Sequence, residues 1–246
     1  MPTERIKRAV LLAAGRGTRM GAITETVPKP MLLVHGKPMM EHIMNGLAEA
    51  GIERFLVAVG YQGELIERYF RNWPLPVEFR VQDPVNGTGR AAGLAKEFAG
   101  DEPFLLTFGD CLCQAAEYLR ITAILEGQPQ AAAVLAAKDI DDPWQGAAIY
   151  EEGGRISRII EKPPKGTSMT RWGSAGFYAF RPVIFDYLER LTPSVRNEYE
   201  ITSAFEMMLQ DGLELRISAV EGEWRDVGRP EDLRAVNGSP RSRESS

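Results

Sequence analysis

The chain of 246 residues contains only two histidines and two cysteines, which narrows the chemistry that its side chains can support. Cys111 and Cys113 lie two residues apart with no histidine nearby, so they offer too few ligands for a structural zinc site, and a buried-thiol role is favoured. His35 and His42 are too few for a histidine-based triad or metal cluster, and surface or packing roles are expected for them. The reactive groups are therefore expected to be carboxylates, lysines and arginines.

Long apolar runs and a basic surface are lacking as well. No stretch approaches the roughly 18 uninterrupted apolar residues of a membrane span. The N-terminal residues MPTERIKRAV lack the apolar core of a signal peptide, so we expect a cytoplasmic protein without a membrane partner. The net charge of −5 argues against binding to nucleic acid, which requires a dense basic surface.

A glycine-rich turn near the N-terminus is the most informative feature that is present. Residues 9–13 (AVLLA) predict a buried strand, and Gly15 and Gly17 allow the backbone to turn so that successive N–H groups point at an anion. Arg19 and Lys29 follow and supply positive charge. The segment is typical of a phosphate site, although the turn taken alone would favour a plain strand-to-helix connection with a solvated arginine.

Two familiar glycine motifs do not fit this turn. The dinucleotide pattern GxGxxG requires glycine where the chain has Met20. The ATPase pattern GxxxxGK would have to end at Gly36 and Lys37, but Met31 occupies the place of its first glycine. The phosphate site is therefore expected to belong to another class.

Apolar runs alternate with amphipathic segments in the first part of the chain, which predicts an α/β fold with a mostly parallel central sheet. Shorter strands after residue 140 predict a β-rich elaboration. We predict one domain over residues 1–236, divided into parts of about 1–140 and 141–236, and a disordered polar tail over 237–246. The expected strands are 8–13, 55–59, 77–81, 104–108 and 131–137, followed by 146–150, 156–161, 173–180 and 213–220.

Apolar spacing also predicts the first helices. Residues at i, i+3, i+4 and i+7 indicate a helix from Met40 to near Gly51. A second stripe over residues 65–70 predicts that Tyr69 packs in the core, and Thr88 is expected to cap a third helix that runs to about Phe98.

Two aspartates stand where a ligand is expected in an open α/β sheet, just beyond the carboxyl ends of strands. Asp110 directly follows residues 104–108, and Asp226 lies between Trp224 and Gly228. Two carboxylates suit Mg²⁺, a hard ion that prefers oxygen ligands. For Asp110 alone, capping of the next helix is a competing interpretation.

Short motifs follow one another along the chain: GRGTR at 15–19, PKP at 28–30, GKP at 36–38, GD at 109–110, EKP at 161–163, SAG at 174–176, NEYEIT at 197–202 and WRDVG at 224–228. This ordered set resembles the sugar-1-phosphate nucleotidyltransferases, also called nucleoside-diphosphate-sugar pyrophosphorylases, over about residues 7–236. Within that family it is similar to glucose-1-phosphate thymidylyl-, uridylyl- and cytidylyltransferases. The resemblance implies a Rossmann-like three-layer αβα nucleotidyltransferase fold whose β-rich elaboration binds sugar, with residues 1–140 binding the nucleotide.

The same resemblance implies roles for individual residues. Arg19 and Lys29 hold the leaving pyrophosphate and the α-phosphate, while Asp110 and Asp226 hold Mg²⁺. The remaining nucleotide-binding positions are Ala13, Ala14, Gly15, Gly17 and Thr18 around the phosphates, with Gln82 and Gly87 at the pyrimidine edge. The positions at the sugar phosphate are Gly146, Glu161, Lys162, Ser174 and Arg196.

The expected reaction is Mg²⁺-dependent transfer of a nucleotidyl group from UTP or dTTP to a sugar 1-phosphate, giving an NDP-sugar and pyrophosphate. Arg90 departs from the family pattern and could read cytosine or guanine instead. A cytidylyl- or guanylyltransferase, a phosphocholine cytidylyltransferase and a non-catalytic regulatory subunit are the alternatives. The sugar, the pathway and self-association into a homo-oligomer are left open.

Overall fold

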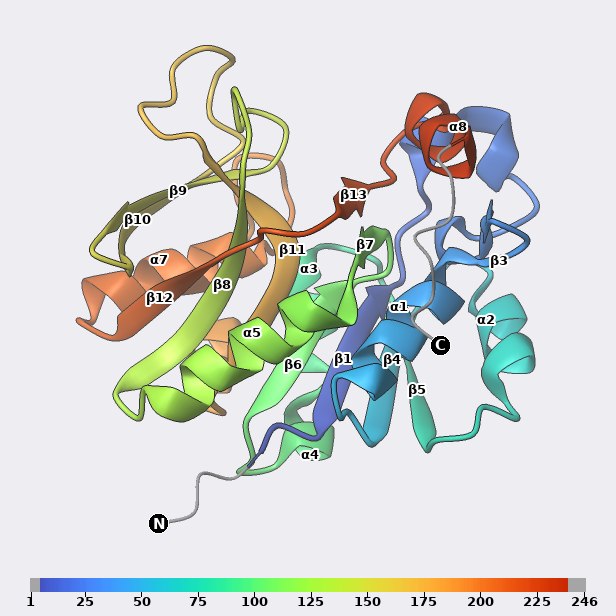
Figure 1. Ribbon diagram of the computed structural model, residues 1–246, viewed down its shortest axis with the longest axis horizontal. Helices are drawn as coiled ribbons and strands as arrows, with labels where there is room; N and C mark the ends of the chain where they lie inside the picture. The colour runs from blue at the N-terminus through green and yellow to red at the C-terminus, as the bar shows by residue number, and fades with distance from the viewer. Residues whose placement is uncertain (1–4, 239–246) are drawn as a thin grey trace.

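A nine-stranded sheet organises the computed structural model, which describes residues 5–238 (Figure 1). Its strand order is β5-β4-β1-β6-β11-β8-β12-β10-β9. The first four of these strands are parallel and correspond to the expected N-terminal α/β part. They are β1 (Arg8–Ala13), β4 (Arg54–Val59), β5 (Val77–Val81) and β6 (Phe104–Phe108).

The other half of the sheet is mixed, because most of its strands follow one another through loops and hairpins instead of crossover helices. β11 runs antiparallel to both β6 and β8, β12 is parallel to β8, and β10 pairs antiparallel with β12 and β9. The predicted fold class is confirmed, with parallel pairing concentrated in the N-terminal half. These strands are β8 (Ala131–Asp139), β9 (Ala147–Glu152), β10 (Arg155–Glu161), β11 (Trp172–Phe180) and β12 (Glu214–Ala219).

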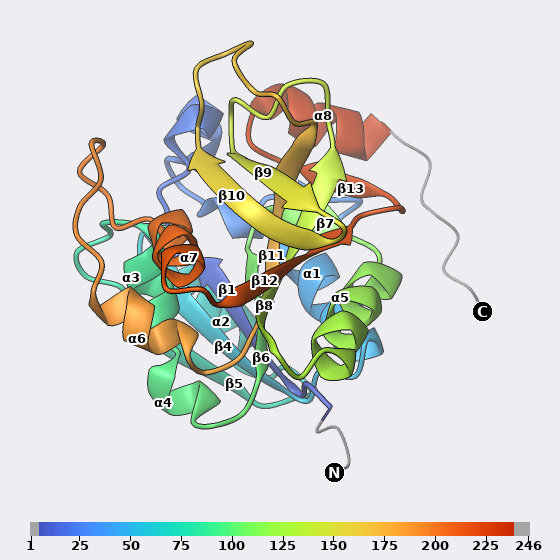
Figure 2. The ribbon, with the colours of Figure 1, turned by 90° about the vertical axis from the view of Figure 1, so that its left-hand side faces the viewer.

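Helices cover both faces of the sheet and produce two hydrophobic cores (Figure 2). Alternate residues of β1 enter different cores: Leu11 packs with the first helix group, and Val10 packs with the second. The first group is α1 (Met39–Glu49), α2 (Gly63–Phe70) and α5 (Ala115–Gly127). The second group is α3 (Thr88–Gly93), α4 (Lys96–Ala99), α6 (Ile184–Glu189) and α7 (Ile201–Gln210).

Two predictions about the helices were wrong. Tyr69 is 48% exposed, and its hydroxyl donates to Glu41 Oε2 at 2.6 Å because it lies on the outer side of α2. Thr88 does not cap a helix that reaches Phe98. Its Oγ1 instead accepts the N–H of Ile201, the first residue of α7, at 3.0 Å.

The C-terminal boundary also differs from the prediction. Helix α8 (Pro230–Gly238) includes the first two residues of the supposed tail, and the Asn237 side chain bonds the Leu33 carbonyl and the His35 N–H. Residues 239–246 lie outside the described part of the chain. Within the described part, no helix is long and apolar enough to cross a membrane.

Two short ladders lie beside the main sheet. β7 (Cys111–Cys113) pairs antiparallel with β13 (Trp224–Asp226), and β2 (Leu33–Val34) pairs with β3 (Lys37–Pro38). Asp110 therefore precedes a strand and does not cap a helix, since α5 begins only at Ala115. The β7–β13 ladder joins the end of β6 to a segment more than a hundred residues later in the chain.

Candidate active site

The glycine-rich turn leaves β1 and packs directly on Lys29. Gly17 has φ +63°, and a Cβ at this position would lie 2.9 Å from the Cβ of Lys29. Only glycine combines this backbone conformation with so close an approach. The turn continues into the 3₁₀ segment η1 (Thr18–Thr24), which places Arg19 on the surface, and Lys29 begins the short helix η2 (Lys29–Met31).

Lys29 is buried and its ammonium contacts a carboxylate. Lys29 Nζ lies 2.5 Å from Asp110 Oδ2, and the lysine is only 9% exposed. Asp110 is brought there because the parallel pairing of β1 with β6 extends to Gly109, whose N–H bonds the Leu12 carbonyl at 3.0 Å. The structure thus brings together the glycine-rich turn, a cation and a carboxylate at the carboxyl ends of the strands, as the sequence predicted.

Asp226 approaches Asp110 through the β7–β13 ladder. It pairs with Cys111, and the Val227 N–H donates to the Asp110 carbonyl at 3.0 Å. One oxygen from each aspartate and the Cys111 Sγ all lie within 4.8 Å of one another. The pKa of Asp226 is raised to about 6, chiefly by desolvation and next by Asp110, while Lys29 and Arg19 oppose the rise.

These donors fit a hard divalent cation. The two carboxylates provide oxygen ligands, and a bound cation would offset the repulsion between their negative charges. Burial is the main cause that raises the pKa of the Cys111 thiol well above its usual range, and the charges of Asp110 and Asp226 add to the rise. The thiol therefore remains protonated and is a poor ligand for a hard ion.

A polar cavity of about 400 Å³ opens beside Asp226 and receives walls from distant segments. Arg19 lines it together with Asp226, so the two predicted phosphate-binding cations and the two predicted metal-binding carboxylates gather in one region. Trp144 and Gln145 reach it from the loop between β8 and β9, and no motif in the sequence pointed to them. The remaining lining residues are Gly228 and Arg229, just before α8, and Glu231 and Asp232 in its first turn.

Gln82 and Gly87, the two predicted base-reading residues, are in direct contact. The Gln82 side chain is 6% exposed, and its Nε2 donates to the Gly87 carbonyl at 2.9 Å. This bond uses one of the two N–H donors of the amide, so the Gln82 Oε1 and the second N–H are the groups left for a ligand.

Tyr199 braces the same loop, a role that sequence reasoning missed although the residue lies inside the NEYEIT motif. Its N–H donates to the Asn86 carbonyl at 2.9 Å, and its carbonyl accepts the Gly89 N–H at 2.8 Å. A Cβ on Gly87 would lie 2.3 Å from this carbonyl oxygen. The guanidinium of Arg90 stacks 4.2 Å above the Tyr199 ring, which accounts for the unusual arginine by cation–π packing.

Four of the predicted sugar-phosphate residues contact one another in pairs. The Lys162 N–H bonds the Gly146 carbonyl at 2.9 Å, and Lys162 itself has φ +43°. Arg196 Nη2 lies 3.2 Å from Glu161 Oε1 and also pairs with the buried Glu200. Arg196 is thus neutralised by acidic side chains, which a sequence motif could not show.

Ser174, the fifth predicted residue of this group, uses its hydroxyl in a different contact. Its Oγ lies 2.8 Å from the hydroxyl of the buried Tyr178. Burial raises the pKa of Tyr178, and Glu161 contributes to the rise. The structure therefore gives Ser174 an internal partner on β11.

The chain is similar to known proteins over most of its length. Residues 8–241 match the family described as nucleotidyl transferase. A low-salt glycan biosynthesis nucleotidyltransferase of Haloferax volcanii, Agl11, is 34% identical over 235 residues, which cover 94% of this chain and 65% of that protein. The chain thus spans less than two thirds of Agl11.

A second relative has nearly the same length. The UTP–glucose-1-phosphate uridylyltransferase AglF of Haloferax volcanii is 34% identical over 232 residues, covering 92% of this chain and 93% of AglF. The crystal structure of a UDP-glucose pyrophosphorylase complexed with UDP-glucose superposes with a TM-score of 0.87 at 24% identity, covering 94% and 97% of the two chains, and this likeness shows the fold. The chain belongs to the nucleotidyl transferase family, and the predicted resemblance to its sugar-1-phosphate nucleotidyltransferases is confirmed.

Proposed function

We propose that this protein transfers a nucleotidyl group from a nucleoside triphosphate, with UTP or dTTP preferred, to a sugar 1-phosphate. The observation that supports the proposal most strongly is the convergence of Lys29, Asp110 and Asp226 beside the glycine-rich turn. Arg19 lines the adjoining cavity. This set offers two cations for phosphate oxygens and two carboxylates for Mg²⁺. A non-catalytic subunit of the same fold would be expected to have lost part of it.

The reaction needs alignment and charge neutralisation more than proton transfer. The phosphate of a sugar 1-phosphate is already ionised at neutral pH, so its oxygen attacks the α-phosphorus without a general base, and pyrophosphate leaves. This agrees with the positions of both histidines at β2–β3 and α1, where His42 Nε2 bonds the Val34 carbonyl and the His35 N–H bonds Asn237.

Each group of side chains has a distinct part in this proposal. Lys29 and Arg19 stabilise negative charge that develops on the leaving pyrophosphate. Lys162 binds the phosphate of the sugar, and Glu161 bonds sugar hydroxyls. Bound Mg²⁺, held by Asp110 and Asp226, would supply further neutralisation of the triphosphate.

Asp110→Asn tests the assignment of the metal-binding carboxylates. We expect turnover to fall by more than about 10²-fold, because the variant removes one charge that holds Mg²⁺ in a phosphoryl-transfer site. Pyrophosphate release at varied Mg²⁺ is the assay, and Glu231→Gln, which removes a carboxylate from the adjoining cavity, is the matched control. Near wild-type turnover of the Asp110 variant at low Mg²⁺ would refute the assignment.

Base preference follows from the Gln82–Gly87 contact. A uracil or thymine base can donate its imide N–H to Gln82 Oε1, whereas the matching ring nitrogen of cytosine is an acceptor and leaves this oxygen without a donor from the base. Such a mismatch costs about 1–3 kcal/mol, which predicts roughly 5- to 150-fold discrimination in kcat/KM. Measuring kcat/KM for UTP, dTTP, CTP, GTP and ATP with one accepted sugar 1-phosphate tests this, and a preference for CTP or GTP would overturn the role of Gln82.

A further inference from the structure

The outer edge of strand β5 points backbone groups away from the main sheet. β5 ends the main sheet and, among the described residues, pairs only with β4 (Figure 1). The Phe55 N–H bonds the Pro76 carbonyl and the Gln82 N–H bonds the Val59 carbonyl, so the even-numbered residues of this segment face β4. In a parallel ladder, the N–H and C=O groups of Val77, Phe79 and Val81 then point away from the sheet.

The edge also exposes apolar surface beside two charged side chains, Glu78 and Arg80. Val81 is 64% exposed, and β5 contains no lysine, internal proline or bulge of the kind that protects edge strands. A groove of about 430 Å³ lies between β5 and α2, and its apolar walls include Phe70, Trp73, Val77 and Phe79. An edge of this type is a template for another strand.

We propose that β5 pairs antiparallel with β5 of a second copy, about a twofold axis at Phe79. In this register, Val77 lies opposite the second copy's Val81, Phe79 lies opposite its counterpart, and both are hydrogen-bonded pairs formed by the outward N–H and C=O groups. Glu78 lies opposite Arg80 twice, once on each side of the axis. The main sheets of the two copies become continuous.

Charge selects both the partner and this register. An axis at residue 78 would place Glu78 opposite Glu78, and an axis at residue 80 would place Arg80 opposite Arg80; like charges directly opposite destabilise a sheet. A slip by one residue would place the outward N–H and C=O groups of one copy opposite residues of the other copy whose backbone groups point at β4. Only the axis at Phe79 aligns all five residues and both opposite-charge pairs.

Within one copy, these charged side chains are available for exchange. Glu78 pairs with Arg54 at 3.2 Å and with Arg80 at 3.3 Å, and all three side chains are 36–48% exposed. Arg80 also donates to the Phe79 carbonyl at 3.2 Å, one of the outward groups of the edge. In the dimer, Arg80 turns to Glu78 of the second copy, while Arg54 remains beside the Glu78 of its own chain. Because two five-residue strands and one groove bury little area, the dimer is expected to dissociate on dilution.

Charge reversal by mixing is the first test. Glu78→Arg makes the edge wholly basic and Arg80→Glu makes it wholly acidic, so each variant alone is expected to be monomeric, and an equimolar mixture is expected to form heterodimers. Sedimentation velocity over a dilution series measures this, with circular dichroism as the check on folding and Glu97→Arg as a control reversal on α4. A wild-type protein that is monomeric at every concentration, or single variants that still dimerise, would overturn the proposal.

Cysteine crosslinking tests the register. Phe79→Cys is expected to form an intermolecular disulfide under mild oxidation because residue 79 lies on the axis. Glu78→Cys alone is expected to crosslink weakly, and strongly when mixed with Arg80→Cys. The wild type, with Cys111 buried and Cys113 partly buried, is the control. Strong crosslinking of Glu78→Cys alone, without crosslinking at position 79, would refute this axis.

Discussion

Asp226→Asn is expected to stabilise the protein in the absence of divalent cations while abolishing its response to them. Asp226 has a pKa raised to about 6, from an ordinary value of 3.8. Ionisation of this carboxylate therefore opposes folding at neutral pH, because the side chain is partly desolvated and because Asp110 lies close. The amide has nearly the same shape and no charge, so the substitution removes the repulsion without leaving a cavity.

The magnitude follows from the shift. About two pKa units correspond to roughly 3 kcal/mol as an upper limit, at about 1.4 kcal/mol per unit. Since much of Asp226 is exposed and solvent screens its charge, we expect about 1 kcal/mol. For a chain of this size, that corresponds to a rise in Tm of about 2–4 °C.

The sign depends on pH. A raised folded-state pKa means that the destabilisation is absent below about pH 4, grows as the pH rises from the ordinary value to about 6, and is complete above that range. The stability gain of Asp226→Asn is thus expected at pH 7.5 and is expected to vanish near pH 4.

Thermal unfolding with EDTA and with Mg²⁺ is the assay. Mg²⁺ is expected to raise the Tm of the wild type but not that of the variant, because a ligand stabilises only the state that binds it. Glu231→Gln, which also removes a carboxylate from the adjoining cavity, serves as the control and is expected to retain the Mg²⁺ response. An Asp226→Asn protein that is less stable than the wild type in EDTA at pH 7.5 would refute the reasoning.

Three further predictions concern the substrate ends of the site. Lys29→Ala is expected mainly to lower kcat, because the lysine acts on charge that develops in the transition state, whereas Lys162→Ala is expected chiefly to raise the KM for the sugar phosphate. Steady-state kinetics with each substrate varied in turn distinguishes the two variants. An unchanged sugar-phosphate KM for Lys162→Ala would contradict the assignment of Lys162. Gly87→Ala is expected to raise the KM for the nucleotide by at least about tenfold, since its Cβ would lie 2.3 Å from the Tyr199 carbonyl oxygen and displace the loop that carries Gln82. Gly93→Ala, where a Cβ meets nothing within 4 Å, is the control for that variant.

The fold was predictable from sequence where periodicity alone determines structure. The strands of the parallel half and helix α1 lie within a few residues of their predicted positions, because apolar spacing reports directly which face is buried. Tyr69 was misplaced because a tyrosine at an apolar position can also lie at the margin and bond a carboxylate, here Glu41. The role of Thr88 depends on α7, more than a hundred residues away, which local capping rules do not consider.

The candidate site was predictable as a set of motifs but not as a network of contacts. The Lys29–Asp110 pair and the neutralisation of Arg196 by Glu161 arise from tertiary packing between separate motifs. Trp144 lines the cavity although its loop carries no recognisable pattern. Motifs identify groups that bear chemistry, whereas the partners that orient them depend on how the strands are ordered in the sheet.

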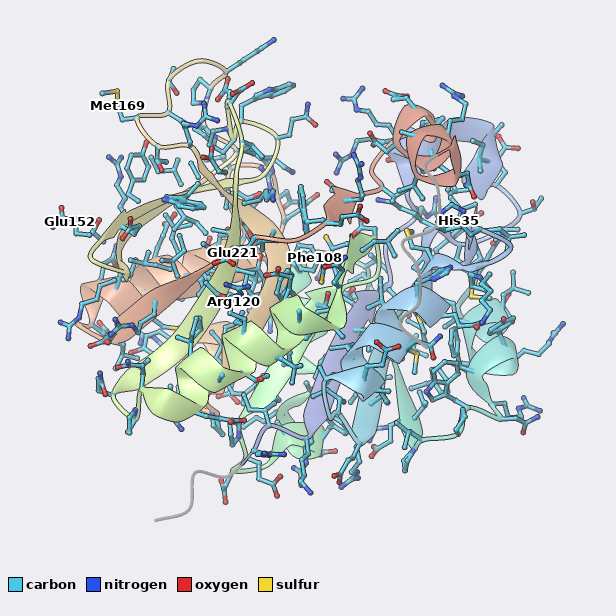
Figure 3. All side chains as sticks on the ribbon, viewed as in Figure 1. His35, Phe108, Arg120, Glu152, Met169 and Glu221 are labelled. Carbon is cyan, nitrogen blue, oxygen red and sulfur yellow. The ribbon has the colours of Figure 1, made fainter. Side chains whose placement is uncertain are left out.

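The segment that delivers Asp226 illustrates this dependence. Between β12 and β13, the chain is held by side chains of α5 and β8: Glu117 Oε1 accepts the Gly222 N–H at 2.8 Å, and Lys138 Nζ donates to the Val220 and Gly222 carbonyls at 3.2 and 3.3 Å. Arg120 adds an ion pair with Glu221, and Figure 3 shows these two residues next to each other above α5.

These contacts set the position of one carboxylate relative to the other. Glu117 is only 2% exposed, and a buried carboxylate is retained at such a site only when backbone or charged partners compensate its desolvation. A Cβ on Gly222 would lie 3.0 Å from Glu117 Oε1, so the glycine permits this close contact. A buried charge therefore holds the path of the chain between β12 and β13. Because β13 pairs with β7 next to Asp110, the separation of the two aspartates is determined by α5 and β8 as much as by the motifs that contain them.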